Sequence, residues 1–168
     1  MTQPVGPGRG PVERPNARAV VTTPDWEVLL IHHRDPGSGR ELWVTPGGGI
    51  EPGEDARGAI RRELREETGL VHPLDGPMVW TRRESFPWNG ATVISVESYF
   101  WCPAARFDPH PADLADDDER ASYLGTRWWT IEELDAPGAA WLAPSRLGAL
   151  VRSLRDSGPP DPPVDAGS

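Results

Sequence analysis

The sequence predicts a single α/β (α+β) domain in which a mixed β-sheet packs between α-helices. Its 168 residues are enough to bury one hydrophobic core. Two observations predict the sheet: short apolar, β-branched runs bounded by turn residues, and an Asn-Gly pair between two such runs. A third predicts the helices, because apolar side chains recur at helical spacing in two stretches. These stretches begin near Ala56 and near Pro144.

The first half of the predicted sheet comes from three runs. Ala17 to Thr22 and Trp26 to His33 are expected to pair across the turn residues Pro24-Asp25. Glu41 to Thr45 follows as a third, shorter strand. It leads into Pro46-Gly47-Gly48-Gly49, which we expect to form a turn before the first helix.

The second half begins with a β-hairpin, Met78 to Phe86 and Ala91 to Cys102, joined at Asn89-Gly90. A two-residue loop predicts the cross-strand pairs Trp88 with Ala91, Phe86 with Val93, Glu84 with Ser95 and Arg82 with Glu97. Thr130 and Glu133 have the spacing of a capping box and predict a short helix after Trp128-Trp129. The last predicted helix runs from Pro144 to Arg155.

Both ends of the chain have the composition of disordered tails. Residues 1–15 and 157–168 are rich in Pro and Gly and have no apolar periodicity. We therefore expect the folded domain to span residues 16–156.

Composition limits the classes of partner. The formal net charge of −9 argues against a stable complex with nucleic acid, which requires a basic surface. No apolar run approaches membrane-spanning length, so no membrane association is expected. The single cysteine, Cys102, has no partner for an internal disulfide, which fits a reducing, cytoplasmic location. The oligomeric state stays open, with a homodimer as one option.

The most informative stretch is residues 48–70, GGIEPGEDARGAIRRELREETGL. Glu63, Glu66 and Glu67 stand at i, i+3 and i+4, so they lie on neighbouring parts of a helix surface. At about 100° per residue, Glu63 and Glu67 fall inside the apolar stripe and Glu66 beside it. Carboxylates that point inward need a positive partner, and a divalent metal ion is the natural candidate.

This stretch resembles the Nudix box, G-x5-E-x7-R-E-U-x-E-E-x-G-U, where U is a bulky aliphatic residue. All nine fixed positions are filled, by Gly48, Glu54, Arg62, Glu63, Leu64, Glu66, Glu67, Gly69 and Leu70. The resemblance implies a Nudix-type fold, with the mixed sheet between helices. It also implies a hydrolase that uses Mg²⁺, or in some members Mn²⁺, to cleave the diphosphate linkage of a nucleoside diphosphate derivative.

The resemblance assigns roles to the residues of the box. Glu63 and Glu67 are the firmest metal ligands, and Glu66 supplies a third carboxylate. The carbonyl of Gly47 is a further candidate ligand, since glycine lets the backbone approach an ion closely. Arg62 and Glu54 are expected to form an ion pair that holds the loop of the box against its helix. The water is deprotonated either by Glu63 or by a carboxylate from a later loop.

Residues outside the box are candidates for binding the substrate. Arg82, Glu97 and Trp88 lie on one face of the predicted hairpin, where charges beside aromatic rings suit a substrate wall. A solvent-facing ion pair explains Arg82 and Glu97 equally well. The acidic run Asp116 to Glu119 could supply the later carboxylate, or it could be only a solvated surface loop.

Two classes of function remain at this point. The first is a metal-dependent diphosphate hydrolase acting on a small nucleotide. The second is a Nudix-fold module that binds or senses a nucleotide without cleaving it. The complete set of box glutamates favours the hydrolase, but the stretch does not identify the substrate.

Overall fold

The computed structural model describes residues 10–35, 38–88, 91–112, 114, 117–138 and 140–167, with backbone alone at 87, 88, 91, 118 and 119. The chain folds as β1 (Val12–Thr22), β2 (Val28–Arg34), β3 (Glu41–Val44), β4 (Gly47–Gly49), α1 (Ala56–Thr68), β5 (Met78–Trp88), β6 (Ala91–Pro103), α2 (Asp117–Ser122), β7 (Tyr123–Trp129), α3 (Ile131–Asp135), β8 (Leu142–Ala143), α4 (Leu147–Ser157) and β9 (Val164–Asp165).

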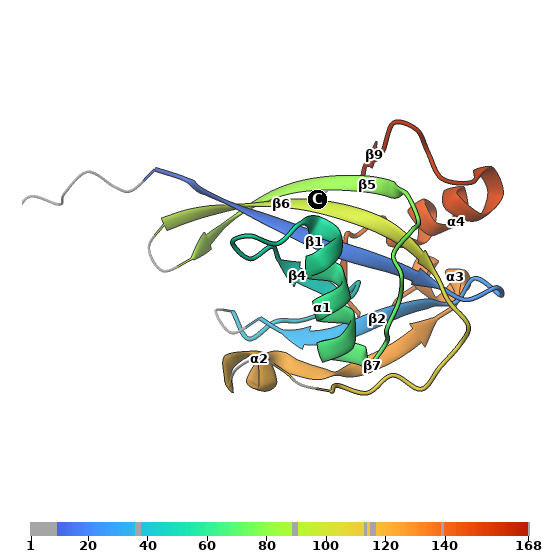
Figure 1. Cartoon of the computed structure of the whole chain (residues 1–168), viewed down its shortest axis with the longest axis horizontal. Helices are drawn as coiled ribbons and strands as arrows, with labels where there is room; N and C mark the ends of the chain where they lie inside the picture. Colours follow the sequence, from blue (N-terminus) through green and yellow to red (C-terminus); the bar gives the residue numbers. More distant parts are fainter. Residues whose placement is uncertain are drawn as a thin grey trace, which may run out of the picture.

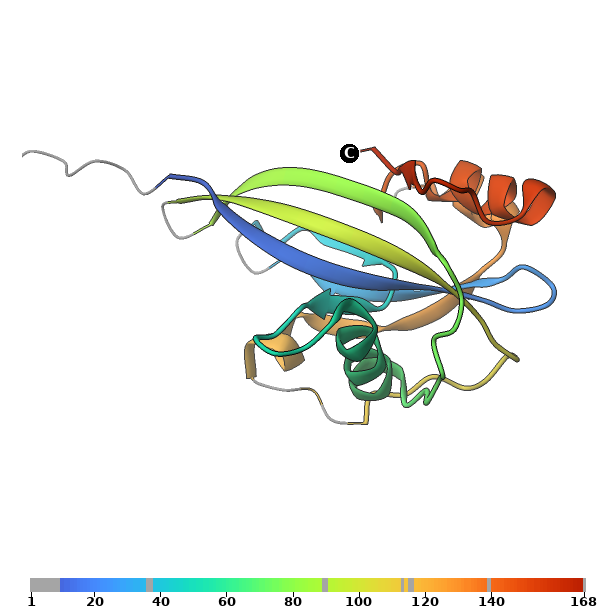
Figure 2. The same cartoon turned by 45° about the horizontal axis from the view of Figure 1, so that its top comes forward.

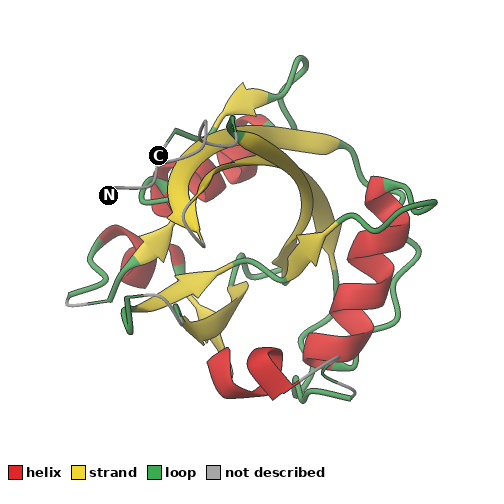
Figure 3. Cartoon of the chain, turned by 90° about the vertical axis from the view of Figure 1, so that its left-hand side faces the viewer, coloured by secondary structure: helices red, strands yellow, loops and turns green. Residues whose placement is uncertain are grey.

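The strands form one mixed, strongly curled sheet, as Figure 3 shows. Its order is β8-β3-β2-β1-β6-β5-β9, with β4 also paired to β1 and β7 to β2. The longest pairing is parallel and joins β1 to β6 along all of β1, from Val12 opposite Val93 to Thr22 opposite Pro103. The curl divides the sheet into two walls, one built on β1, β6 and β5 and the other on β2, β3 and β7.

Helices cover both sides of the sheet, which confirms the predicted sandwich. Alternate residues of β1 point in opposite directions. Ala17 and Ala19 pack with Ile60 and Leu64 of α1, whereas Val20 belongs to a second core cluster with α3 and α4. Figures 1 and 2 show α1 on one side of β1 and α4 on the other. The helix α1, which carries the Nudix-box glutamates, is therefore packed against one face of β1. The other face contributes to the second core cluster and to a cavity described below.

The predicted tails are wrong where the structure describes them. Residues 12–15 belong to β1 and pair with β6, because the long parallel pairing carries β1 beyond the core. At the other end, β9 pairs in parallel with β5, and Ala166 is fully buried in the core. Residues 1–9 and Ser168 lie outside the described residues. The domain therefore extends at both ends beyond the predicted limits of 16 and 156.

Two predicted loops also contain regular structure. Gly47 to Gly49 form the short strand β4, because glycine can approach the neighbouring β1 closely. Asp117 to Glu119 begin the helix α2, and Asp116 lies outside the described residues. Other predictions are confirmed. The hairpin has the predicted register from Arg82 opposite Glu97 to Trp88 opposite Ala91, and Thr130 and Glu133 form the capping box of α3.

Candidate active site

The helix α1 presents its glutamates inward, as the spacing predicts. Glu63 and Glu67 are 7% and 2% exposed, and they share the buried face of the helix with Leu64. The helix begins cleanly because the side chain of Asp55 accepts a hydrogen bond from the backbone of Gly58. It ends at Gly69, whose left-handed backbone suits glycine. The helix is thus a rigid support for carboxylates that solvent hardly reaches.

The strand β4 lies directly against these carboxylates. The backbone N–H of Gly47 donates to Oε2 of Glu67 at 2.9 Å. At Gly48 a Cβ atom would lie 2.5 Å from Oε1 of Glu63, so only glycine fits beside that carboxylate as it stands. The carbonyl of Gly47, predicted as a metal ligand, accepts a hydrogen bond from the guanidinium of Arg18 at 2.8 Å. A guanidinium on that oxygen would repel a metal ion, so this arrangement does not favour Gly47 as a ligand.

Arg62 connects the loop before α1 to the helix itself through hydrogen bonds and ion pairs. Its Nε and one terminal nitrogen donate to the two carboxylate oxygens of Glu54, each at 3.1 Å, which is the ion pair predicted between loop and helix. The same guanidinium donates to Oε1 of Glu63 at 2.8 Å and to the carbonyl of Gly49 at 3.0 Å. Hydrogen bonding to Glu54 raises the pKa of Arg62, although partial burial opposes it, and Arg62 in turn lowers the pKa of Glu54.

A metal ion fits the chemistry of this site. Within the described residues no three acidic, histidine or cysteine side chains already converge as metal ligands. Glu63 and Glu66 face Arg62, and Glu67 faces the backbone of Gly47. All three side chains nevertheless offer carboxylate oxygens, which hard cations prefer as ligands. Two of the three glutamates, Glu63 and Glu67, are buried. The three glutamates are therefore the residues that would hold the ion.

Two further side chains contact Glu67, and sequence reasoning missed both. Nε2 of His33 lies 3.5 Å from Oε1 of Glu67, and the hydroxyl of Tyr123 donates to its backbone carbonyl at 3.2 Å. The neighbouring His32 and His33 have different partners, because successive side chains of a strand point to opposite faces. His32 stacks on Trp43 instead, with ring centroids 4.3 Å apart.

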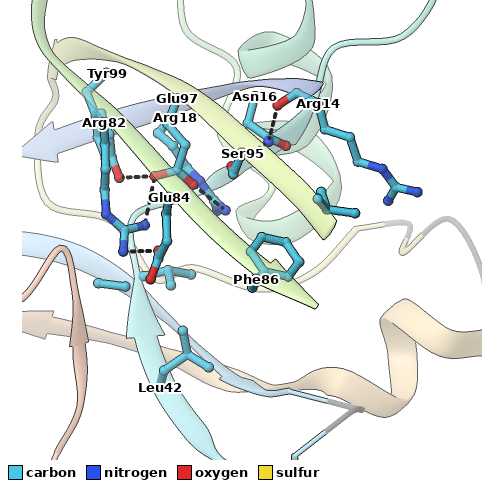
Figure 4. Close-up of a pocket in the computed structure, with 13 residues that line it drawn as sticks. Arg14, Asn16, Arg18, Leu42, Arg82, Glu84, Phe86, Ser95, Glu97 and Tyr99 are labelled. Atoms are coloured by element: carbon cyan, nitrogen blue, oxygen red, sulfur yellow. Dashed lines mark hydrogen bonds and ion pairs between the residues drawn. The ribbon is translucent and has the colours of Figure 1, made fainter. Parts of the chain in front are cut away.

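A polar cavity of about 270 Å³ lies on the other face of β1. Its walls follow the two-residue alternation of the strands: every second residue of β1, β5 and β6 points into it. Leu42, Val44 and Ala143 close it from the opposite wall. The lining from the three long strands is Arg14, Asn16, Arg18, Arg82, Glu84, Phe86, Val93, Ser95, Glu97 and Tyr99 (Figure 4). Trp43, which lies between Leu42 and Val44 on β3, points to the other face and packs against Trp129.

Arg82 and Glu97 belong to the wall of this cavity, as Figure 4 shows. They are only 7% and 5% exposed, which excludes the solvent-facing ion pair. Glu97 accepts from Arg82 at 3.1 Å, from the hydroxyl of Tyr99 at 2.6 Å and from Arg18 at 3.4 Å. Burial alone would raise the pKa of Glu97, but Arg18, Tyr99 and Arg82 together lower it. The side chain of Trp88, the third predicted substrate contact, lies outside the described residues.

Arg18 is the important residue that the sequence analysis missed. It donates to the carbonyls of Thr45 and Gly47 and to Glu97, so it connects the cavity to the backbone beside Glu67. One signal could have identified it: Arg18 interrupts an otherwise apolar run, between the fully buried Ala17 and Ala19. A charged residue there must find a buried partner.

The acidic run stays a candidate source of a later carboxylate. Asp117 is exposed and pairs with Arg120, three residues further along α2. The side chains of Asp118 and Glu119 lie outside the described residues. The contact between Tyr123 and Glu67 brings the end of α2 near the box helix.

Fold and site together define a class of protein: a domain with a curled mixed sheet that has a helix of buried carboxylates on one face of β1 and a polar cavity on the other. The sequence matches the NUDIX domain family over residues 12–149. The chain therefore belongs to the NUDIX family.

Individual relatives agree with this assignment. The RNA pyrophosphohydrolase of Sphingopyxis alaskensis is 40% identical over 132 residues, which cover 73% of this chain and 80% of that protein. The nucleoside triphosphatase NudI of Salmonella paratyphi B is 48% identical over 98 residues, covering 55% and 64%. The NUDIX domain of NrtR from Shewanella oneidensis, solved with ADP ribose, has the same fold, with a TM-score of 0.60, 20% identity and coverage of 84% and 88%.

These findings favour catalysis over a module that only binds a nucleotide. The protein is an enzyme, a Nudix hydrolase that cleaves a pyrophosphate linkage. Hydrolases of this family generally use divalent metal ions, and relatives in it act on nucleotides. In the part of the chain that the structure describes, no helix is long and apolar enough to cross a membrane.

Proposed function

We propose that this protein is a Mg²⁺-dependent hydrolase of a small nucleoside diphosphate derivative, with Glu63, Glu66 and Glu67 holding the metal. One observation carries the proposal: carboxylates buried on the inner face of α1 lie against glycines of β4. Mg²⁺ prefers oxygen ligands in an octahedron and usually keeps part of its water, which suits this donor set. Mn²⁺ takes similar oxygen ligands and is the alternative metal.

The metal would neutralise the diphosphate oxygens and lower the pKa of the attacking water. The water oxygen then bonds to phosphorus, and the bridging P–O bond breaks with its electron pair going to the leaving phosphate. The water proton goes to a carboxylate, either Glu63 or an acid of the segment from Asp116 to Glu119. Arg62 and Glu54 hold the helix and loop in register during this step, and Arg62 fixes the orientation of Glu63.

The remaining part of the substrate would enter the cavity beside Arg82 and Glu97. Polar side chains there can bind the ribose or base, and the exposed ring of Phe86 offers a stacking surface. The name of the Sphingopyxis relative, RNA pyrophosphohydrolase, adds RNA as a second candidate substrate. The net charge of −9 favours the small molecule, because extended RNA requires a basic surface.

Hydrolysis of a substrate panel tests this proposal. The panel contains nucleoside triphosphates, nucleoside diphosphate sugars, ADP ribose and a 5′-triphosphate RNA oligonucleotide, each with Mg²⁺, Mn²⁺ or EDTA. We expect Glu67→Gln to lower turnover about a hundredfold or more while leaving the fold intact. Glu51→Gln, which removes an exposed acid before the helix, is the matched control. Turnover like that of the wild type in Glu67→Gln, or in EDTA, would contradict the proposed metal site.

We also propose that the protein acts in the cytoplasm, supported by the free and buried thiol of Cys102. Burial raises the pKa of that thiol to about 12, so it is inert at neutral pH. A homodimer and the absence of a stable nucleic-acid complex both stay predictions, which light scattering and RNA-binding assays can test.

A further inference from the structure

The C-terminal segment, residues 158–167, returns from α4 to the outer edge of the sheet, as Figures 1 and 2 show. Its strand β9 pairs with β5, with Val164 opposite Trp80 and Asp165 opposite Thr81. The backbone N–H of Ala166 then donates to the carbonyl of Thr81 at 2.7 Å, and its side chain is fully buried. The segment is therefore an integrated part of the domain beside the cavity wall.

The last described residue of this segment, Gly167, contacts Arg82 of β5. The carbonyl of Gly167 accepts a hydrogen bond from Nε of Arg82 at 3.0 Å. The two terminal nitrogens of that guanidinium contact Glu97 and Glu84, so three parts of the chain hold one side chain. A guanidinium has five N–H donors. Among the described residues these three contacts leave two of the donors for another partner, and Arg82 lines the cavity.

Gly167 itself is held in a specific conformation. Its φ of +73° lies in the left-handed region, and its N–H donates to the side chain of Asp165 at 3.0 Å. A Cβ atom there would lie 3.7 Å from the nearest atom, a carbon of Arg146, which is an ordinary contact. Space is therefore available at this position, and the backbone conformation is what favours glycine.

We propose that the carbonyl of Gly167 is a positioning group for substrate binding: it orients Arg82 so that its remaining N–H groups face the cavity. The inference rests on the proposed function, in which the cavity holds the substrate. A backbone carbonyl suits this purpose because it adds no charge to a cluster in which Arg82 and Arg18 already balance Glu97 and Glu84. Buried guanidinium groups need such satisfied partners to keep one orientation. The C-terminal segment is thereby a determinant of substrate affinity.

Two substitutions at one position separate the carbonyl's role from the space around it. Asn tolerates the left-handed conformation, whereas the β-branched Val does not. We expect Gly167→Val to move the carbonyl and raise KM roughly tenfold, the size of one hydrogen bond to a charged group. kcat should stay within about twofold, because the box helix is untouched. Gly167→Asn should keep KM near that of the wild type. Asp165→Ala removes the side chain that accepts from the N–H of Gly167 and should raise KM as Gly167→Val does. Asp165→Asn keeps an acceptor oxygen and should raise KM less.

A readout independent of catalysis is the NMR signal of the Arg82 Nε–H group, assigned by its loss in Arg82→Lys. Its exchange with solvent should accelerate in Gly167→Val and not in Gly167→Asn. In the Arg82→Lys background, Gly167→Val should raise KM no further. Unchanged exchange, or an equal rise in KM without Arg82, would overturn the inference. Failure of the proposed function is distinct: Glu67→Gln would then keep full turnover, whatever the exchange at Arg82.

Discussion

Three consecutive glycines in β4 lead to three different expected outcomes when each is changed to alanine. At Gly47 the added Cβ atom would lie 2.2 Å from the carbonyl oxygen of Ala17, and φ is +133°. Backbone strain of this kind costs about 1–3 kcal/mol, and overpacking a similar amount. Since β1 is paired on both sides, it cannot move away cheaply. We expect Gly47→Ala to lower the free energy of unfolding by about 3 kcal/mol or more.

Gly48→Ala should instead affect catalysis. Its Cβ atom would meet Oε1 of Glu63 at 2.5 Å, and the side chain of Glu63 can move where a backbone cannot. Ordinary contact begins at 3.4 Å, so the carboxylate must shift by about 0.9 Å (3.4 minus 2.5). A misplacement of about 1 Å at a catalytic group can lower the rate a hundredfold. We therefore expect kcat to fall by roughly tenfold to a hundredfold, with a change in unfolding free energy below about 1 kcal/mol.

Gly49→Ala is the matched control. The nearest atom to its Cβ position is Oδ1 of Asn16 at 3.8 Å, which is an ordinary contact. Urea denaturation and steady-state kinetics on the three variants form the assay, and we expect stability and turnover of Gly49→Ala to stay close to those of the wild type. The reasoning is refuted if Gly47→Ala unfolds within about 0.5 kcal/mol of the wild type, or if Gly48→Ala keeps full turnover.

The cavity wall yields two further predictions. Arg18→Met should lower the free energy of unfolding by about 2–3 kcal/mol, measured by urea denaturation, because it removes one of the two cations that pair with the buried Glu97. Arg14 is exposed on the same strand, and Arg14→Met should change this free energy by less than about 0.5 kcal/mol. Equal effects of the two would contradict the bridging role of Arg18. The pKa of Glu97 is lower in the folded state, so the unfolded state binds more protons as pH falls. The stability from Glu97 is therefore present above its ordinary pKa of 4.5 and is lost as pH drops through the folded pKa. The unfolding free energy of Glu97→Gln, followed from pH 7 downwards, should depend less steeply on pH below about 4.5. An unchanged slope would refute this reasoning.

The box helix could be predicted from sequence because its chemistry is local. Glu63 and Glu67 fall on the apolar side of the helix by spacing alone, and burial to 7% and 2% follows from that geometry. The hairpin register was equally local, since the two residues of the turn determine which residues pair. In both cases the residues that determine the structure are close to one another in the sequence.

The rest of the site depends on pairings between distant segments. Arg18 meets Glu97 only because β1 runs parallel to β6, at a separation of 79 residues. No turn sets the register of a parallel pair, so this contact had no local signal. The C-terminal segment was missed because its local composition is misleading. Its Pro and Gly content indicates disorder, but the buried side chain of Ala166 and the pairing of β9 with β5 keep the segment in place.

The two faces of β1 explain how one strand serves both parts of the site. Ala17 and Ala19 are small enough to let α1 approach on one face, while Arg18 between them points to the cavity. From there Arg18 reaches the carbonyl of Gly47, whose N–H holds Glu67. A ligand that draws Arg18 away from Gly47 would therefore change the backbone that orients Glu67, one of the carboxylates proposed to hold the metal. This connection of two hydrogen bonds is one route by which the cavity can influence the helix α1.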